Sequence, residues 1–160
     1  MIKRTGFAET AQAALYYEVW EKSVPAGADG PAERTPLVML HGNGEDHHIF
    51  DRMAEIMSRK FRVILMDSRG HGASRSGACL KRDGMFTIED MAGDVIEVLD
   101  VLGKGEAALL GFSDGANIAL EAASRFPDRI TAVAAVSGNA LPWGVTPGFF
   151  LTVQAQYPLY

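Results

Sequence analysis

Three glycine-rich segments hold the residues of this chain that could carry out chemistry. Residues 111–115 read Gly-Phe-Ser-Asp-Gly, which places the Ser113 hydroxyl between two glycines. Residues 41–44 read His-Gly-Asn-Gly, and residues 67–74 read Asp-Ser-Arg-Gly-His-Gly-Ala-Ser. A serine hydroxyl becomes a nucleophile for acyl transfer when a base takes its proton and amide groups stabilise the negative charge that develops. The first question is therefore which elements position Ser113.

Each of these segments directly follows an apolar run. Solid runs without polar alternation are typical of strands buried on both faces, as in a parallel sheet. Between the runs, apolar residues recur at helical spacing. This alternation of strands and helices indicates right-handed βαβ crossovers and a doubly wound, mostly parallel α/β sheet. The expected strands are 37–40, 61–66, 107–110 and 130–136, and the expected helices are 49–57, 88–102 and 114–126.

Local signals support the ends of these elements. Thr87 followed by Asp90 is typical of a capping box, and Gly103 suits the end of the same helix. Residues 6–20 predict a small antiparallel hairpin, while the proline- and glycine-containing stretch 21–36 predicts a surface loop.

The segment 111–115 matches the pattern G-x-S-x-G with a strand before it and a helix after it. Such a turn is so sharp that its central residue is strained, and glycines two positions before and after leave room for the backbone. Ser113 would then lie at the edge of the sheet, at the amino end of a helix whose dipole and free amides favour negative charge.

The three motifs in this order resemble the α/β-hydrolase superfamily, in particular its esterase, peptidase and C–C hydrolase branch. The resemblance implies that residues 1–140 form the hydrolase core and that 141–160 begin a lid. It also implies an oxyanion hole formed by the backbone amides of Asn43 and Asp114. The serine disfavours the dehalogenase and epoxide hydrolase branches, which use aspartate at this position.

Further residues are assigned around this site. Gly42, His47 and His48 are candidates for the substrate cleft, with the two histidines facing solvent or substrate. The resemblance implies that His41 and His71 brace loops.

The rest of a catalytic triad is missing after Ser113. In this superfamily the chain order is serine, acid, histidine, whereas all four histidines, at positions 41, 47, 48 and 71, precede the serine. The later carboxylates are Asp114, Glu121 and Asp128, and none suits the acid role. We therefore expect an α/β-hydrolase fold truncated after the sixth strand, with little turnover of its own. A ligand-binding pseudoenzyme and one half of a split hydrolase are the alternatives.

The composition limits the classes of molecule that we expect this protein to bind. A net charge of −5 and a pI near 5.3 argue against nucleic acid and anionic membranes. The single cysteine, Cys79, cannot form an intramolecular disulfide, and without an evident secretory signal we expect a cytoplasmic protein acting on a small molecule. An apolar strand 130–136 at the edge of such a sheet predicts self-association.

Metal and nucleotide sites are not expected. His47 and His48 have only Glu45 and Asp46 as nearby partners, which are too local to complete a tetrahedral zinc site. The glycine spacing at 42–44 and at 103–105 fits neither a dinucleotide fold nor a phosphate loop, so no cofactor is predicted. Methionines including Met53, Met57 and Met66 are expected in the core. The arginines and lysine at 69, 75, 81 and 82 are expected in a solvated loop.

Overall fold

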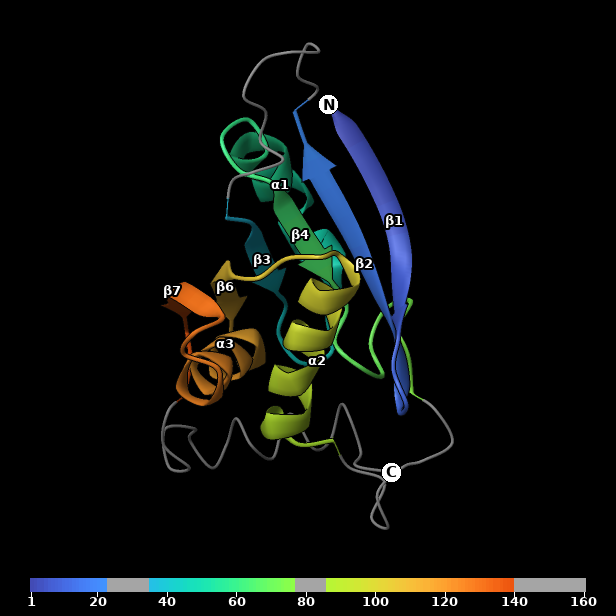
Figure 1. The fold of residues 1–160 in the computed structure, drawn as a ribbon, viewed down its shortest axis with the longest axis vertical. Coiled ribbons are helices and arrows are strands. Elements are labelled where there is room, and N and C mark those ends of the chain that lie inside the picture. The colour runs from blue at the N-terminus through green and yellow to red at the C-terminus, as the bar shows by residue number, and fades with distance from the viewer. Residues whose placement is uncertain (23–34, 77–85, 140–160) are drawn as a thin grey trace.

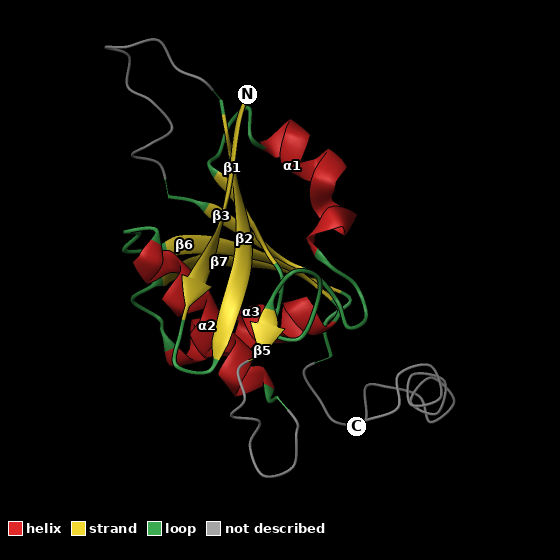
Figure 2. Cartoon of the chain, turned by 90° about the vertical axis from the view of Figure 1, so that its right-hand side faces the viewer, coloured by secondary structure: helices red, strands yellow, loops and turns green. Residues whose placement is uncertain are grey.

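The computed structural model describes residues 1–22, 35–76 and 86–139 and shows three layers (Figures 1 and 2). A twisted sheet lies between helix α1, Asp51–Met57, on one face and helices α2, Ile88–Val101, and α3, Asp114–Arg125, on the other. A short 3-10 helix, His47–Phe50, leads into α1. Among these described residues, no helix has both the length and the apolar character needed to cross a bilayer.

The sheet confirms the predicted fold class. Strands run in the order β1-β2-β4-β3-β6-β7, and a two-residue strand, β5, pairs with β2. The pairs β4-β3, β3-β6 and β6-β7 are parallel, whereas β1 and β2 are an antiparallel hairpin added at one side. The strands are β1 Ile2–Glu9, β2 Ala13–Glu21, β3 Leu37–Leu40, β4 Val63–Met66, β5 Arg75–Ser76, β6 Ala107–Phe112 and β7 Ile130–Val136.

Strands β3 and β4 are buried at every position, as their solid apolar runs predict. The expected strand 61–66 begins two residues late, at Val63. Phe61 is 38% exposed because it still belongs to the turn after α1, where its amide donates to the Met57 carbonyl.

Helix α2 confirms both of its predicted ends. The Thr87 side chain accepts from the Asp90 amide while the Asp90 carboxylate accepts from the Thr87 amide, so two otherwise unpaired donors are satisfied. Gly103, just past the helix, has a φ of +62°, which favours glycine.

Helix α1 corrects the predicted core. Phe50 and Ala54 are buried and Met57 packs against them. Met53, expected in the core, is 42% exposed, and so to similar degrees are Ile49 and Ile56. A short helix that stands alone on its face of the sheet buries one narrow stripe, so the apolar residues beside that stripe stay in solvent.

Strand β7 lies at the edge of the sheet, as predicted. Most of its residues are exposed, including Ala132, Ala134 and Val136 on the same side as α1. Cys79, the two basic residues at 81 and 82, most of the loop 21–36 and the expected lid 141–160 lie outside the described residues.

Candidate active site

Ser113 lies in the tight turn that the sequence predicts. It follows the last residue of β6 and is the N-cap of α3, with φ +54° and ψ −117°. A serine held at positive φ costs on the order of 1–3 kcal/mol, which persists only where the surrounding structure fixes the turn. Its hydroxyl makes no capping bond to the helix, so it is available for other chemistry.

The two glycines of the motif are required by close backbone contacts. A Cβ at Gly111 would lie 2.1 Å from the Gly115 carbonyl oxygen, and one at Gly115 would lie 2.0 Å from the Leu40 carbonyl oxygen. No side chain fits at such distances. The second contact also shows that the start of α3 packs directly on the end of β3.

The loop 41–44 lies against the serine. A Cβ at Gly42 would be 3.1 Å from the Cβ of Ser113. The Gly42 amide donates to the Glu45 carboxylate at 3.0 Å, so it is already engaged. The next amide along the chain, that of Asn43, is the one that the sequence predicts for the oxyanion hole.

Asp114 supplies the second amide of that assignment. As the first residue of α3, its N–H has no intrahelical acceptor. Burial raises the pKa of the Asp114 carboxyl, and the nearby rings of His71 and His41 oppose this only in part. The carboxyl therefore stays protonated to higher pH than a solvated aspartate.

His41 and His71 brace loops, as predicted. The buried His41 ring donates from Nδ1 to the Gly42 carbonyl at 2.7 Å and accepts at Nε2 from the Ser68 amide at 3.0 Å. His71 contacts the Arg69 carbonyl through Nδ1, and its Nε2 lies 3.3 Å from the Asn43 side-chain oxygen. Together they join the loop 41–44 to the loop after β4.

His47 corrects the prediction that it lines the cleft. It is only 5% exposed, and both its amide and its Nδ1 donate to Asp67 Oδ1 at 2.8 Å. Asp67, at the end of β4, is fully buried, and its second oxygen accepts from the Ala73 amide at 2.8 Å. A buried carboxylate needs several donors, and His47 supplies two of them.

A buried acid that the sequence analysis did not single out lies on the other side of His47. Glu18 Oε1 is 3.3 Å from His47 Nε2, and Glu18 is 2% exposed. Burial acts to raise the pKa of Glu18, but hydrogen bonds from Lys3, Trp20 and Tyr16 lower it below its usual value. The sequence held one signal of this burial, because Glu18 lies between Tyr16 and Trp20 on one face of the strand.

The pKa of the Tyr16 phenol shifts in the opposite direction to that of Glu18. Burial and the hydrogen bond from Tyr16 to Glu18, 2.9 Å long, raise the pKa of Tyr16 to about 12. The phenol therefore remains a neutral donor at physiological pH.

His48 is exposed and lies beside a cavity that Ser113 does not border, so its place in a substrate cleft stays a prediction. The cavity has a volume of about 520 Å³ and is bordered by Asn43, His71 and His48 among others. Gly42 does not border this cavity but contacts Ser113 instead.

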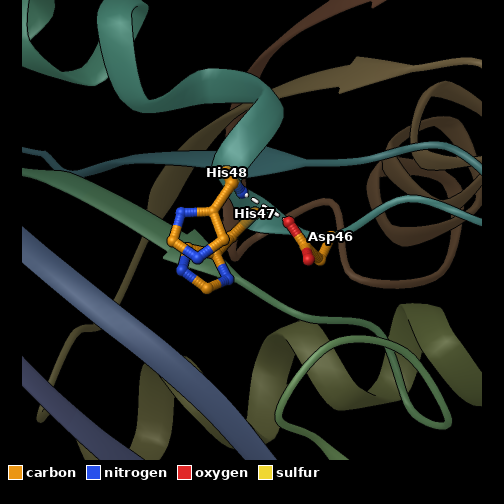
Figure 3. Close-up of side chains that lie close together, drawn as sticks. All are labelled: Asp46, His47 and His48. Carbon is orange, nitrogen blue, oxygen red and sulfur yellow. Dashed lines mark hydrogen bonds between the residues drawn. The ribbon is translucent and has the colours of Figure 1, made fainter.

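Asp46, His47 and His48 place potential metal ligands within 4.8 Å of one another (Figure 3). The two imidazole rings are tilted against each other, with centroids 4.1 Å apart and planes 35° apart. His47 Nδ1 is bonded to Asp67, and His48 Nδ1 is bonded to Asp51 at 2.9 Å. The Nδ1 atoms of both rings are therefore engaged by carboxylates, whereas the buried His47 Nε2 has no hydrogen-bond partner among the described residues and lies 3.3 Å from Glu18 Oε1.

Arg69 corrects the expected solvated loop. It is 6% exposed and donates to both carboxylate oxygens of Asp94, from Nε at 2.6 Å and from a terminal nitrogen at 2.5 Å. The pairing joins the loop after β4 to α2. Two opposite charges buried together in this fork geometry hold the loop in one position.

Within the described residues, none of the four histidines and none of the later carboxylates makes a side-chain hydrogen bond to Ser113. Each of the four histidine rings contacts a group other than the serine. Glu121 faces Arg125 at 3.9 Å, and Asp128 is exposed before β7. The described residues around Ser113 thus comprise a strained serine and the backbone amides of Asn43 and Asp114, the groups predicted for the nucleophile and the oxyanion hole.

Comparison with known proteins shows the fold family of this chain. The model of the alpha/beta hydrolase fold family matches residues 35–158. The chain is 39% identical over 98 residues to the magnesium-chelatase 30 kDa subunit of Rhodobacter capsulatus, covering 61% of this chain and 33% of that protein. It is 30% identical over 100 residues to 2-(acetamidomethylene)succinate hydrolase of Mesorhizobium japonicum, covering 62% of this chain and 34% of that protein.

A solved structure shows the same arrangement of elements. The crystal structure of a hydrolase from Pseudomonas aeruginosa matches 95% of this chain and 51% of that protein, with a TM-score of 0.73 and 26% identity. The chain therefore belongs to the α/β-hydrolase fold family. It spans about a third of the length of the two curated relatives and about half of this structure.

Proposed function

We propose that this chain carries the nucleophile and oxyanion hole of a serine hydrolase that acts on an ester, amide or activated C–C bond of a small molecule. The observation that supports this most directly is Ser113, held at positive φ between a central strand and a helix, with Gly42 packed against it. Ser113 is held at positive φ while its hydroxyl makes no cap to its helix, and strained residues of this kind cluster at active sites.

The proposed reaction proceeds through an acyl-enzyme. The Ser113 oxygen attacks the substrate carbonyl carbon and its proton passes to a base. The carbonyl oxygen takes the negative charge opposite the amides of Asn43 and Asp114. The bond to the leaving group then breaks with transfer of a proton to that group, and water releases the acid from the serine.

The base and its acid partner would come from outside the described residues, either from a further part of the same protein or from another chain. The two alternatives predicted above remain: a pseudoenzyme that binds a ligand, and one half of a split hydrolase. A cytoplasmic location belongs to the proposal on the basis of the single cysteine.

A serine-directed fluorophosphonate probe tests this proposal. We expect negligible labelling of the chain alone, and labelling of Ser113 once a polypeptide that supplies the acid and histidine is added. The Ser113→Ala variant should abolish that labelling. The matched control is Ser137→Ala, because Ser137 also ends a strand at positive φ, +55°, and its loss should leave labelling unchanged.

The other outcomes are distinct. Efficient labelling of the isolated chain would contradict the need for an external base, and labelling that survives Ser113→Ala would contradict the nucleophile. A chain that binds esters but is never labelled, even with the added polypeptide, would indicate the pseudoenzyme.

We also propose that β7 allows two copies of the chain to associate edge to edge. The strand Ile130–Val136 has no charged residue, and at the sheet edge it pairs with β6 alone among the described strands. Such an edge is a template for another strand. Light scattering at micromolar concentration should show dimers or larger species, and Val136→Lys should reduce them while Leu120→Lys, on exposed α3 surface, should not. A clean monomer of the native chain would contradict this.

A further inference from the structure

His47 Nε2 is a buried polar atom without a hydrogen-bond partner among the described residues. The other ring nitrogen, Nδ1, is bonded to the Asp67 carboxylate at 2.8 Å and therefore carries a hydrogen. In the neutral ring, Nε2 then presents a lone pair. A buried polar atom without a partner is costly, so this nitrogen requires an explanation.

A carboxylate oxygen faces this nitrogen. Glu18 Oε1, on β2, lies 3.3 Å from His47 Nε2, and both residues are more than nine-tenths buried. Charge-assisted N–H···O bonds are shorter, at about 2.7–2.9 Å, as is the bond from the same ring to Asp67. The nitrogen lone pair and the carboxylate oxygen are both acceptors, and a cation between them would satisfy both.

The separation of these two atoms fits a metal ion. Zinc binds nitrogen and oxygen at about 2.0 Å, so two ligand atoms of a tetrahedral zinc ion lie about 3.3 Å apart. Lys3 and Trp20 hold the other oxygen of Glu18, at 2.9 Å each, and Oε1 accepts from the Tyr16 phenol. These hydrogen bonds lower the pKa of Glu18, which keeps it ionised as a metal ligand must be. One lone pair of Oε1 is left for an ion.

The hydrogen bonds around the two histidines are those of metal-binding imidazoles. A histidine that binds a metal through one ring nitrogen nearly always donates from the other to a carboxylate or a carbonyl, which fixes the ring. His47 donates in this way to Asp67, and His48 to Asp51 at 2.9 Å. The two rings are neighbours, with centroids 4.1 Å apart (Figure 3). Each ring keeps its Nε2 outside the bond to its carboxylate.

We propose that this site binds one zinc ion through His47 Nε2, Glu18 Oε1 and His48 Nε2, with water as the fourth ligand. Two imidazoles and one carboxylate with an open position are a common zinc set, whereas calcium and magnesium prefer oxygen ligands. His48 is exposed, so its ring is free to turn toward the ion and offers a path from solvent. The prediction that no metal is bound considered only partners close in sequence, whereas β2 brings Glu18 from a distant segment.

Such an ion would join the hairpin β1-β2 to the 3-10 helix His47–Phe50. Through the bond from His47 to Asp67, it would also hold the end of β4. An ion that binds only the folded state raises the stability of that state. This proposal goes beyond the proposed hydrolase function and does not depend on it, because Ser113 supplies no ligand.

Isothermal titration calorimetry of the full chain with zinc chloride, after removal of metal by a chelator, tests this proposal. We expect saturable binding of one ion per chain and a rise in the midpoint of thermal unfolding. Cobalt(II) as a probe should give the intense visible absorption of a four-coordinate ion. The weak absorption of six-coordinate cobalt would indicate adventitious binding to surface carboxylates and would overturn the proposal. Absence of saturable zinc binding would also overturn it.

Substitutions identify the ligands. His47→Gln, Glu18→Gln and His48→Gln should each weaken zinc binding at least about tenfold, because even the loss of an outer hydrogen-bond partner costs about 10–100-fold. The matched controls are His71→Gln, in the loop after β4, and Glu106→Gln, an exposed carboxylate before β6. Both controls should leave zinc affinity unchanged.

Circular dichroism of each variant shows whether it is folded. His48→Gln keeps the test valid if a buried variant fails to fold, because His48 is exposed. Unchanged zinc affinity of His48→Gln, or equal weakening by His71→Gln, would overturn the site. Neither result would alter the labelling of Ser113, so this proposal and the hydrolase proposal fail independently.

Discussion

The turn after β6 and the segment after β4 reach the same edge of the sheet but treat their polar side chains in opposite ways. Ser113 is half-exposed, strained and without a capping bond. Asp67 is fully buried and accepts from His47 and Ala73. The serine is kept available, whereas the aspartate is fully engaged.

The contrast indicates how the strained turn is maintained. His41 and His71 join the segment after β4 to the loop at 41–44, and Gly42 of that loop packs against Ser113. The segment after β4, whose polar groups are hydrogen-bonded (the satisfied segment), therefore supports the strained turn at Ser113 through the loop 41–44. Variants in each segment should reveal this division as different effects on the free energy of unfolding.

The largest effect is expected from Gly115→Ala in the strained turn. The new methyl group would lie 2.0 Å from the Leu40 carbonyl oxygen. Only a shift of the backbone can relieve this clash. We expect a loss of about 3 kcal/mol or more in the free energy of unfolding, measured by urea denaturation. The control is Gly93→Ala in α2, where nothing lies within 4 Å, so helix propensity predicts a gain of up to about 1 kcal/mol. Similar losses at both positions would contradict the crowding argument.

Asp67→Ala should be nearly as damaging in the satisfied segment. Its loss leaves the amides of His47 and Ala73 and the His47 ring without their acceptor inside the protein. We expect a cost of about 3 kcal/mol in chemical denaturation, because each buried donor loses its partner. The exposed Asp128→Ala should change stability by less than about 0.5 kcal/mol. A small effect of Asp67→Ala would mean that water replaces the carboxylate.

Ser113→Gly should stabilise the fold, in contrast to every change in the satisfied segment. Glycine adopts positive φ without the clash of a Cβ, so the variant should gain about 1 kcal/mol while losing all probe labelling. Ser113→Ala retains the Cβ and should leave stability within about 0.5 kcal/mol of the native value. Equal stability of the glycine and alanine variants would show that the turn holds little strain.

The smallest effect is expected from Asp114→Asn, and it should depend on pH. Burial raises the pKa of Asp114 above its unfolded value, so the folded state is penalised when the group is ionised. The penalty is absent below the unfolded pKa and complete above the folded pKa. Asparagine should therefore match the native chain near about pH 3 and be more stable near about pH 7, by less than about 1 kcal/mol because solvent screens this partly exposed group. A larger gain at acidic pH would reverse the assigned sign.

The sequence predicted the sheet and the nucleophile turn because both depend on local chemistry. Strands β3 and β4 are buried on both faces, so their residues form solid apolar runs that need no knowledge of the neighbours. Gly111 and Gly115 are demanded by backbone contacts within or next to the turn itself. Such requirements can be predicted from residues that are adjacent in the sequence.

The errors concern side chains whose partners are distant in sequence. His47 and Asp67 are 20 positions apart, and Arg69 and Asp94 are 25 apart. Their pairing depends on how the strands are ordered, so polar residues that were expected in solvent are buried. Met53 was misplaced for a related reason, because helical spacing identifies an apolar face but not how much of it another layer covers.

Gly42 has a practical consequence for anyone diversifying this protein. A Cβ there would be 3.1 Å from the Ser113 Cβ and 2.8 Å from the Glu45 carboxylate, so any substitution must displace Glu45 and shift Ser113. Mutant libraries aimed at altered selectivity should keep residue 42 as glycine and vary His48 instead, whose side chain borders open space. Within this loop, substitutions should therefore be poorly tolerated at residue 42 and well tolerated at residue 48.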